Sequence, residues 1–244
     1  SQVEKAVEDI LEALDGNVVL GLPLALGKPV QFANALYRRA KADPGISLTI
    51  YTALSLGRPR AGTDLEKRFL EPFSERVFGD YEELEYLTDL STDRLPGNVQ
   101  VHEFYFRPGA LLRNQTAQQN YISSNYTLAA RDLNATGINV LAQMVASRGQ
   151  GDEQSLSLSC NPELTLDLLP MLDKRKNAGE KIFLVAQVHR DLPFMINDAE
   201  FSPDLLDILI DDERGHQTLF STPNMPVEMT APEQSIFQFA ALCP

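Results

Sequence analysis

Short apolar runs alternate along the chain with segments whose apolar residues recur at helical spacing. An amphipathic segment at residues 2–14 comes first, and the apolar run at residues 18–26 follows it. Residues 29–42 return to helical spacing behind an opening proline, and residues 47–54 form the next apolar run. The order helix, strand, helix, strand predicts an α/β protein with a mostly parallel sheet flanked by helices.

The same rhythm continues through the rest of the chain. Further strands are predicted at residues 99–106, 138–146, 155–160, 181–189 and 218–221, and further helices at residues 111–117, 126–134, 164–176 and 232–242. Residues 204–212 have the pattern of a short helix or strand. Either Ser124 or Asn125 is expected to cap the helix at residues 126–134, because both side chains accept hydrogen bonds from helix amides.

One segment, residues 62–95, departs from this rhythm and predicts a helical excursion beside the sheet. Four of its apolar residues recur at helical spacing and predict a buried stripe: Leu65, Phe69, Phe73 and Val77. Four of its acidic residues are expected to form a solvated face: Glu82, Glu83, Glu85 and Asp89.

Residues 154–193 carry the clearest functional signal. They are predicted to form two strands joined by a helix, which is one βαβ unit with parallel strands. Ligands of parallel α/β sheets bind outside the carboxyl ends of the strands. The two polar loops that follow these strands, residues 160–162 and 187–193, are therefore the first places to look for a site.

Composition narrows the class of protein. The chain has 244 residues, 43% of them hydrophobic, and a net charge of −13 without a run rich in lysine and arginine. This charge disfavours a nucleic-acid partner and is expected mainly to aid solubility. The longest apolar run is too short to span a bilayer, so no membrane association is expected. With two cysteines and no disulfide framework, a cytoplasmic protein is the expectation.

Residues 21–28 follow a strand and open a helix, where backbone amides often hold phosphate. The segment fails as a nucleotide-binding P-loop, because the spacing between Gly21 and Gly27 is too long and Pro29 stands where a serine or threonine is required. A tight turn that touches an anionic ligand remains open. No G-x-G-x-x-G follows a strand, so a dinucleotide site has no support.

Catalytic and metal-binding signatures are weak. His102, His189 and His216 lack the neighbouring ligands of a zinc site, so no metal is expected. The serines at residues 155–159 are expected to alternate outward from a strand without a nucleophile elbow. Cys160 is expected to be buried rather than reactive.

Several segments, taken in order, resemble the acetyl-CoA hydrolase/transferase group of class I CoA-transferases. Residues 21–29 and 34–40 are similar to the family's opening strand, glycine turn and helix. Residues 121–125 are similar to the segment that the family places before its third-layer strand, and residues 151–161 resemble the family's turn and short strand, which commonly contains Ser-Leu-Gly. Gln187-Val-His189 with Leu192-Pro193 resembles an ending that is commonly Glu-Val-Asn followed by Met-Pro, and residues 233–244 resemble the family's closing helix.

The resemblance implies a CoA-transferase-like fold, with residues 1–244 as a single N-terminal domain and a catalytic C-terminal domain expected beyond Pro244. In the family a glutamate of that second domain attacks the acyl-CoA thioester, and a glutamyl-CoA intermediate is resolved by water or a carboxylate. No glutamate here matches that motif, so no catalytic residue is assigned and the isolated chain is expected to be inactive.

This half is expected to form one wall of the cleft for coenzyme A and the acyl group. The candidate substrate-binding residues are Gly27, Lys28, Asn161, Gln187 and His189. The expected partners are an acyl-CoA, a small carboxylate and the C-terminal domain, with coenzyme A as substrate and no resident cofactor. A homodimer is left open, as are the acyl group and the choice between hydrolase and transferase.

Two other functions stay open at this point. One is a non-catalytic α/β module that binds an anion or a partner through residues 21–28. The other is a complete enzyme of the sugar-phosphate isomerase type, which would need an acid/base pair converging in the cleft. The residues alone do not identify such a pair.

Overall fold

A computed structural model describes residues 1–79 and 81–212 of the chain. The chain divides into two compact units, each described by itself. Among the described residues, the larger contains Ser1–Gly57 and residues 82–212, and the smaller contains Arg58–Tyr81. The strand predicted at residues 218–221 and the helix predicted at residues 232–242 lie outside the described residues.

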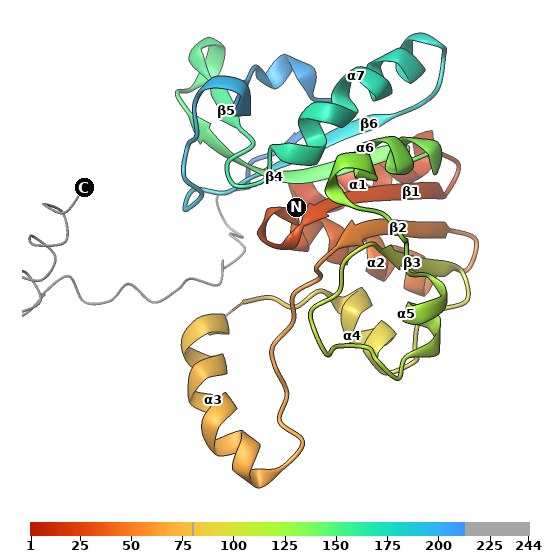
Figure 1. The fold of residues 1–244 in the computed structure, drawn as a ribbon. Coiled ribbons are helices and arrows are strands. Elements are labelled where there is room, and N and C mark those ends of the chain that lie inside the picture. Colours follow the sequence, from red (N-terminus) through yellow and green to blue (C-terminus); the bar gives the residue numbers. More distant parts are fainter. Residues whose placement is uncertain (80, 213–244) are drawn as a thin grey trace, which may run out of the picture. The chain divides into compact units, whose positions relative to one another are not determined.

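The larger unit is built on a sheet in which β3, β2, β1, β4, β6 and β8 are neighbours in that order and all run parallel (Figure 1). These strands are β1 (Asn17–Leu24), β2 (Ser47–Ala53), β3 (Val99–Glu103), β4 (Val140–Arg148), β6 (Phe183–Val188) and β8 (Ile208–Ile210). The prediction of an α/β protein with a mostly parallel sheet flanked by helices is confirmed. β1, β2, β3 and β6 end one to three residues earlier than predicted, whereas β4 begins and ends two residues later.

Two short strands extend β4 with the opposite direction. β5 (Ser155–Ser157) pairs antiparallel with the end of β4, and β7 (Glu200–Phe201) pairs antiparallel with β5. The prediction that the strand at residues 155–160 belongs to a parallel βαβ unit is therefore wrong. The βαβ unit is formed by β4, α7 (Glu163–Asn177) and β6, and β5 is the returning arm of a hairpin inserted into it.

Helices cover both faces of the sheet (Figure 1). The remaining helices of this unit are α1 (Gln2–Ala13), α2 (Val30–Ala42), α4 (Glu85–Ser91), α5 (Gln115–Gln119) and α6 (Tyr126–Ala135), with 3₁₀ turns η1 (Ala25–Gly27), η2 (Gly151–Glu153), η3 (Asn197–Ala199) and η4 (Pro203–Leu205). α1 packs with α2 on one side, and α6 packs with α7 on the other. A capping box of Ser1 and Glu4 begins α1, and Asn125 caps α6 as one of the two expected residues.

The core on the α6 and α7 side is built from alternate positions of the strands. Leu141 of β4 and Leu184 of β6 are register partners on this face, and they pack with Leu168 and Leu172 of α7. Gln143, which shares the face with Leu141, is the polar exception on β4 and is only 3% exposed. Burial of these leucines contributes roughly 1.5–3 kcal/mol per side chain.

The helical excursion contains two helices that differ in burial. In the smaller unit, α3 (Asp64–Phe78) begins with a capping box of Thr63 and Glu66, but none of its described residues is buried. Leu65 and Phe69 are each 78% exposed and Phe73 is 42% exposed, so the expected buried stripe is wrong. Helical spacing predicts that apolar residues share a face, and it does not say what covers that face.

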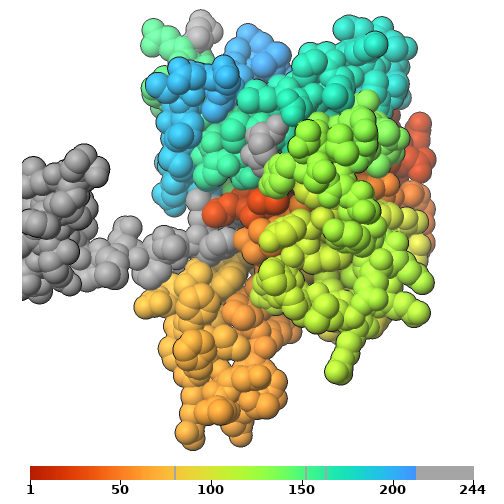
Figure 2. All heavy atoms as spheres, in the orientation of Figure 1, coloured from red at the N-terminus to blue at the C-terminus, as the bar shows by residue number. Residues whose placement is uncertain are grey.

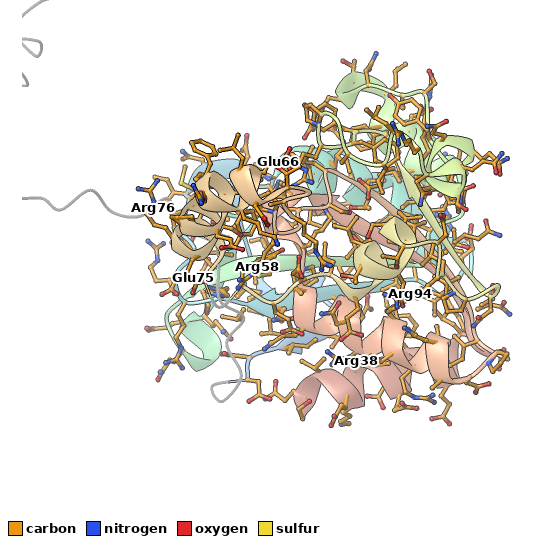
Figure 3. All side chains as sticks on the ribbon, turned by 90° about the horizontal axis from the view of Figure 1, so that it is seen from below. Arg38, Arg58, Glu66, Glu75, Arg76 and Arg94 are labelled. Atoms are coloured by element: carbon orange, nitrogen blue, oxygen red, sulfur yellow. The ribbon has the colours of Figure 1, made fainter. Side chains whose placement is uncertain are left out.

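An ion pair joins the beginning of the smaller unit to α3. Arg58 Nη1 lies 3.8 Å from Glu75 Oε2, and both side chains are labelled in Figure 3. Such a pair at an exposed position contributes little to stability.

Other expectations in this region also need correction. Asp89, placed on a solvated face by its sequence context, is only 6% exposed, and its carboxylate accepts a 2.6 Å hydrogen bond from Tyr37 Oη. Lys41 Nζ also donates to it. The helix predicted at residues 111–117 begins later, because Leu111 has a positive φ of 59° and Asn114 caps α5. Among the described helices, none combines the length and the apolar composition needed to cross a membrane.

Candidate functional site

The carboxyl ends of the parallel strands define the candidate site. From β1 the chain moves to β2 and β3 on one side, while β4, β6 and β8 lie on the other side of β1. The strand order therefore reverses between β1 and β4, and such a switch point is where open α/β sheets bind their ligands. Gly27 and Lys28 follow β1 at this edge, and Gln187 and His189 lie at the end of β6.

Gly27 and Asn161 are brought together at the switch point. A Cβ atom added to Gly27 would lie 2.5 Å from Asn161 Oδ1, so the amide occupies the space that any other residue would fill. Asn161 Nδ2 donates a 3.0 Å hydrogen bond to the carbonyl oxygen of Leu24, the last residue of β1. The glycine turn is thus held by a side chain that comes from the far end of the inserted hairpin.

Asn161 is itself held from beneath by Gln143. Gln143 Nε2 donates to the carbonyl oxygens of Asn161, at 2.8 Å, and Leu158, at 3.2 Å. Thr165 Oγ1 on α7 donates to Gln143 Oε1. All three side chains are less than 10% exposed, so this network fixes the backbone of residues 158–161 against β4.

The side chain of Gln187 forms hydrogen bonds with the first turn of α2. Its Oε1 accepts a 3.4 Å hydrogen bond from the backbone N–H of Phe32, and its Nε2 donates to Gln31 Oε1 at 3.0 Å. The residue before α2 is Pro29, whose side chain caps no amide, so Gln187 supplies a helix cap from a neighbouring strand. Gln187 is 4% exposed and lies with its side chain turned toward α2.

His189 ends β6 in a tight turn. Its backbone N–H donates to Val145 at 2.9 Å, and its Nδ1 accepts from the backbone N–H of Asp191 at 3.2 Å. The imidazole is only 2% exposed. The ring therefore organises the loop that follows β6 through Nδ1.

The side chain of Lys28 reaches the end of β2. Its Nζ donates to the carbonyl oxygen of Ala53 at 2.6 Å and to that of Leu54 at 3.4 Å. The side chain is 1% exposed, and this burial lowers the pKa of Lys28 from 10.5 to about 7, against the opposing effect of the Glu103 charge. Lys28 thereby joins the loop after β1 to the end of β2.

Glu103, at the end of β3, is the acidic partner of Lys28 and was not a candidate from sequence. Burial raises the pKa of Glu103, and the Lys28 charge and hydrogen bonding with Ser55 oppose that rise. Its Oε2 accepts from the backbone N–H of Ser55 at 3.2 Å, and its Oε1 has no hydrogen-bond partner among the described residues. A buried amine and a buried carboxyl with shifted pKa values are typical of functional sites, although structural pairs also show them.

A signal for Glu103 does exist in the sequence. It follows an alternating strand, between His102 and Phe104, at the carboxyl end where ligand-binding side chains gather. Ser55, whose Oγ lies 2.8 Å from Tyr86 Oη, has no comparable signal, because Tyr86 belongs to α4 and only the fold brings the two together.

The hairpin residues correct two further expectations. Ser157 and Ser159 are buried, since Ser157 Oγ donates to the carbonyl oxygen of Met195 and Ser159 Oγ to that of Pro193, at 2.7 Å and 2.8 Å. They tie β5 to the loop after β6 and do not point outward. Cys160 is exposed, contrary to its expected burial, because it follows the turn that reverses the chain.

This fold is shared with solved structures of RipA. The crystal structure of RipA from Yersinia pestis matches 100% of this chain with a TM-score of 0.58 and 18% identity, and the match covers 48% of RipA. A variant of RipA gives a TM-score of 0.58 at 17% identity, covering 98% of this chain and 47% of the other. At these identities the likeness shows the fold alone. The chain spans about half the length of the RipA structures it matches.

A 4-hydroxybutyrate CoA-transferase from Porphyromonas gingivalis is a weaker match, with a TM-score of 0.44 and 14% identity over 88% of this chain and 39% of that protein. This likeness is too weak to support an inference. The sequence matches no protein-family model and no curated protein.

Proposed function

We propose that this chain is part of an acyl-CoA hydrolase or CoA-transferase and forms one wall of the cleft for coenzyme A and the acyl group. The support comes from the fold, which is shared with RipA over the whole chain, taken together with the ordered sequence segments that resemble the acetyl-CoA hydrolase/transferase family. The reversal of strand order between β1 and β4 also supports the proposal, because open α/β sheets bind ligands at such switch points.

In the proposed reaction, coenzyme A passes from an acyl thioester to a small carboxylate or the thioester is hydrolysed by water. A carboxylate nucleophile forms an acyl anhydride and releases the CoA thiolate. The thiolate then attacks the enzyme's carbonyl carbon, giving an enzyme thioester and a free acid. We assign the nucleophilic glutamate to a C-terminal catalytic domain, because no residue at this edge matches the family's motif.

The chain's own residues would then shape and position the cleft. Asn161 fixes the turn at Gly27, and Gln187 fixes the first turn of α2. Both leave the backbone amides of these loops in set places, where such groups could stabilise the oxyanion of the thioester. On this proposal Lys28 supports the wall from within, since its ammonium already donates to Ala53 and Leu54.

The alternative of an anion-binding module at residues 21–28 has less support. The backbone amides of this turn would have to hold the anion without help from Lys28, whose side chain is 1% exposed and directed at backbone carbonyls. An isomerase of the sugar-phosphate type needs an acid/base pair that reaches the substrate. Lys28 and Glu103 are such a pair in chemistry, but with 1% and 2% exposure they face the interior.

The test is coenzyme A binding and exchange by the whole protein that contains this chain. Acetyl-CoA is titrated by calorimetry, and CoA transfer is followed by mass spectrometry with labelled acetate as acceptor. Asn161→Ala should weaken acetyl-CoA binding at least about tenfold by loosening the Gly27 turn. Asn17→Ala is the matched control, because Asn17 is exposed at the opposite, amino end of β1. Absence of saturable binding of either acetyl-CoA or free CoA to the unmodified protein would overturn the proposal.

A further inference from the structure

A cavity lies on the α7 side of the sheet, apart from the strand ends. Its floor is formed by β4 and β6, its roof by α7, and its rim by the segment from Asp198 to Leu206. α7 and this segment lie side by side at the surface (Figure 2). The cavity volume is about 40 Å³, within a hollow of about 470 Å³ that includes open solvent. One water molecule needs roughly 10–15 Å³ on that scale, so a group of a few heavy atoms fits.

The walls are almost entirely aliphatic. The apolar side chains that line the cavity come from β4, α7 and β6, from the turn at Leu158 and from the rim, and they include Leu141, Leu169, Leu184 and Leu206. Aliphatic walls with one or two placed polar groups are typical of small-molecule sites. Here the buried polar groups are Gln143 and Thr165.

The hydrogen bonds of this pair decide what the cavity can recognise. Both protons of Gln143 Nε2 are used, on the carbonyl oxygens of Leu158 and Asn161, and the single proton of Thr165 Oγ1 is used on Gln143 Oε1. What remains are acceptor lone pairs on Gln143 Oε1 and Thr165 Oγ1. A ligand that meets this pair must therefore bring a hydrogen-bond donor.

The donor must also be neutral. An ammonium group would lose its hydration inside aliphatic walls, and the carboxylate among the lining residues, Asp198, is exposed at the rim. A hydroxyl group satisfies one acceptor at a much lower desolvation cost. We propose that this cavity is a binding site for a short aliphatic molecule that carries a hydroxyl group, which donates to Thr165 Oγ1, because Gln143 Oε1 already accepts the proton of Thr165.

Such a ligand is connected to the candidate site through a single side chain. The amide of Gln143 that faces the cavity also donates to the backbone of Asn161, whose side chain occupies the space above Gly27. Occupation of the cavity therefore stabilises the arrangement that holds the glycine turn. This inference does not depend on the proposed CoA chemistry, because it concerns a different face of the sheet.

The experiment compares two probes of nearly equal shape, 1-butanol and 1-fluorobutane, only one of which has a hydroxyl proton. Binding to the whole chain is followed by saturation-transfer NMR titration. One net hydrogen bond of about 1 kcal/mol predicts that 1-butanol binds about fivefold more tightly. Thr165→Val keeps the side-chain shape and should reduce this preference to about one. Thr127→Val, at an exposed position of α6, is the control and should leave it unchanged.

A second variant keeps the proposal testable if the buried substitution Thr165→Val prevents folding. Leu205 is 48% exposed at the rim, so Leu205→Trp should fold normally and block the entrance. It should abolish binding of both probes. The proposal is overturned if 1-butanol shows no saturable binding, if both probes bind equally well to the unmodified chain, or if the preference survives in Thr165→Val.

Discussion

The buried pair of Lys28 and Glu103 gives a prediction whose sign and size follow from the structure. Lys28 has a pKa of about 7 in the folded chain and 10.5 when exposed. Between these values the unfolded chain binds a proton that the folded chain does not. Raising the pH through this window therefore stabilises the fold, by about 1.4 kcal/mol per pH unit and about 5 kcal/mol in total. Below about pH 7 the full cost of burying the ammonium is present.

Glu103 changes the stability with pH in the opposite direction, so its effect must be removed before that of Lys28 is measured. Its folded pKa is raised above 4.5, so the folded chain holds a proton that the unfolded chain has lost. Its contribution to stability is complete below about pH 4.5 and declines as the pH rises through the folded pKa. In a Glu103→Gln background this effect is absent. Loss of the supporting carboxylate also lowers the pKa of Lys28 further, which widens its window toward lower pH.

The assay is urea unfolding of Glu103→Gln and of the double variant Glu103→Gln/Lys28→Met between pH 6 and 9. Methionine keeps the unbranched shape of lysine without the charge. The free energy of unfolding of Glu103→Gln should rise relative to the double variant by about 3 kcal/mol between pH 7 and 9. Parallel pH profiles for the two variants would refute the assignment of a buried, proton-releasing lysine. When Glu103 is present, Lys28→Met alone should lower the free energy of unfolding by about 3–5 kcal/mol near neutral pH, because the substitution leaves a buried carboxyl group without its partner.

Two further predictions concern single contacts. Gly27→Ala should lower the free energy of unfolding by about 1–3 kcal/mol, because the new Cβ displaces the Asn161 side chain and breaks its hydrogen bond to Leu24. Gly97→Ala is the control and should change the free energy little, because no atom lies within 4 Å of the added Cβ. Equal effects of the two substitutions in a urea titration would contradict this prediction. Burial opposes ionisation of Asp89, but hydrogen bonds from Lys41 and Tyr37 outweigh it and lower the pKa of Asp89 below 3.8. Tyr37→Phe should therefore lower the free energy of unfolding by about 1–2 kcal/mol above that pH, and the difference should shrink as the pH falls through the folded pKa of Asp89. A difference that does not change with pH would argue against a hydrogen bond to the charged carboxylate.

The layered fold could be predicted from the sequence, because each predicted strand or helix depends on local periodicity. The parallel strands β1, β2, β4 and β6 were found with small errors at their ends. The direction of β5 could not be found in this way. A three-residue strand has the same alternation whether it runs parallel or antiparallel, and its direction depends on the hairpin that joins it to β4.

The site was predictable only in outline. The sequence predicts that Asn161 follows a parallel strand, whereas in the structure it reaches the switch point from the far end of an antiparallel hairpin. Glu103 was missed because the partner that raises its significance, Lys28, is distant in sequence. The burial of Asp89 was missed for the same reason, since Tyr37 and Lys41 lie on a different helix.

The contacts of the candidate residues change what their side chains are expected to do. Three candidate side chains form hydrogen bonds with the protein's own backbone: Asn161 with Leu24, Gln187 with Phe32 and Lys28 with Ala53. Side chains used in this way hold loops in place and have little capacity left for a ligand. The groups that this wall can present to a substrate are then backbone amides of the loops, whose positions these side chains determine. Substitution of Asn161 should accordingly change affinity through the geometry of the Gly27 turn, and in the proposed enzyme the acyl transfer itself would rely on groups supplied from outside this edge.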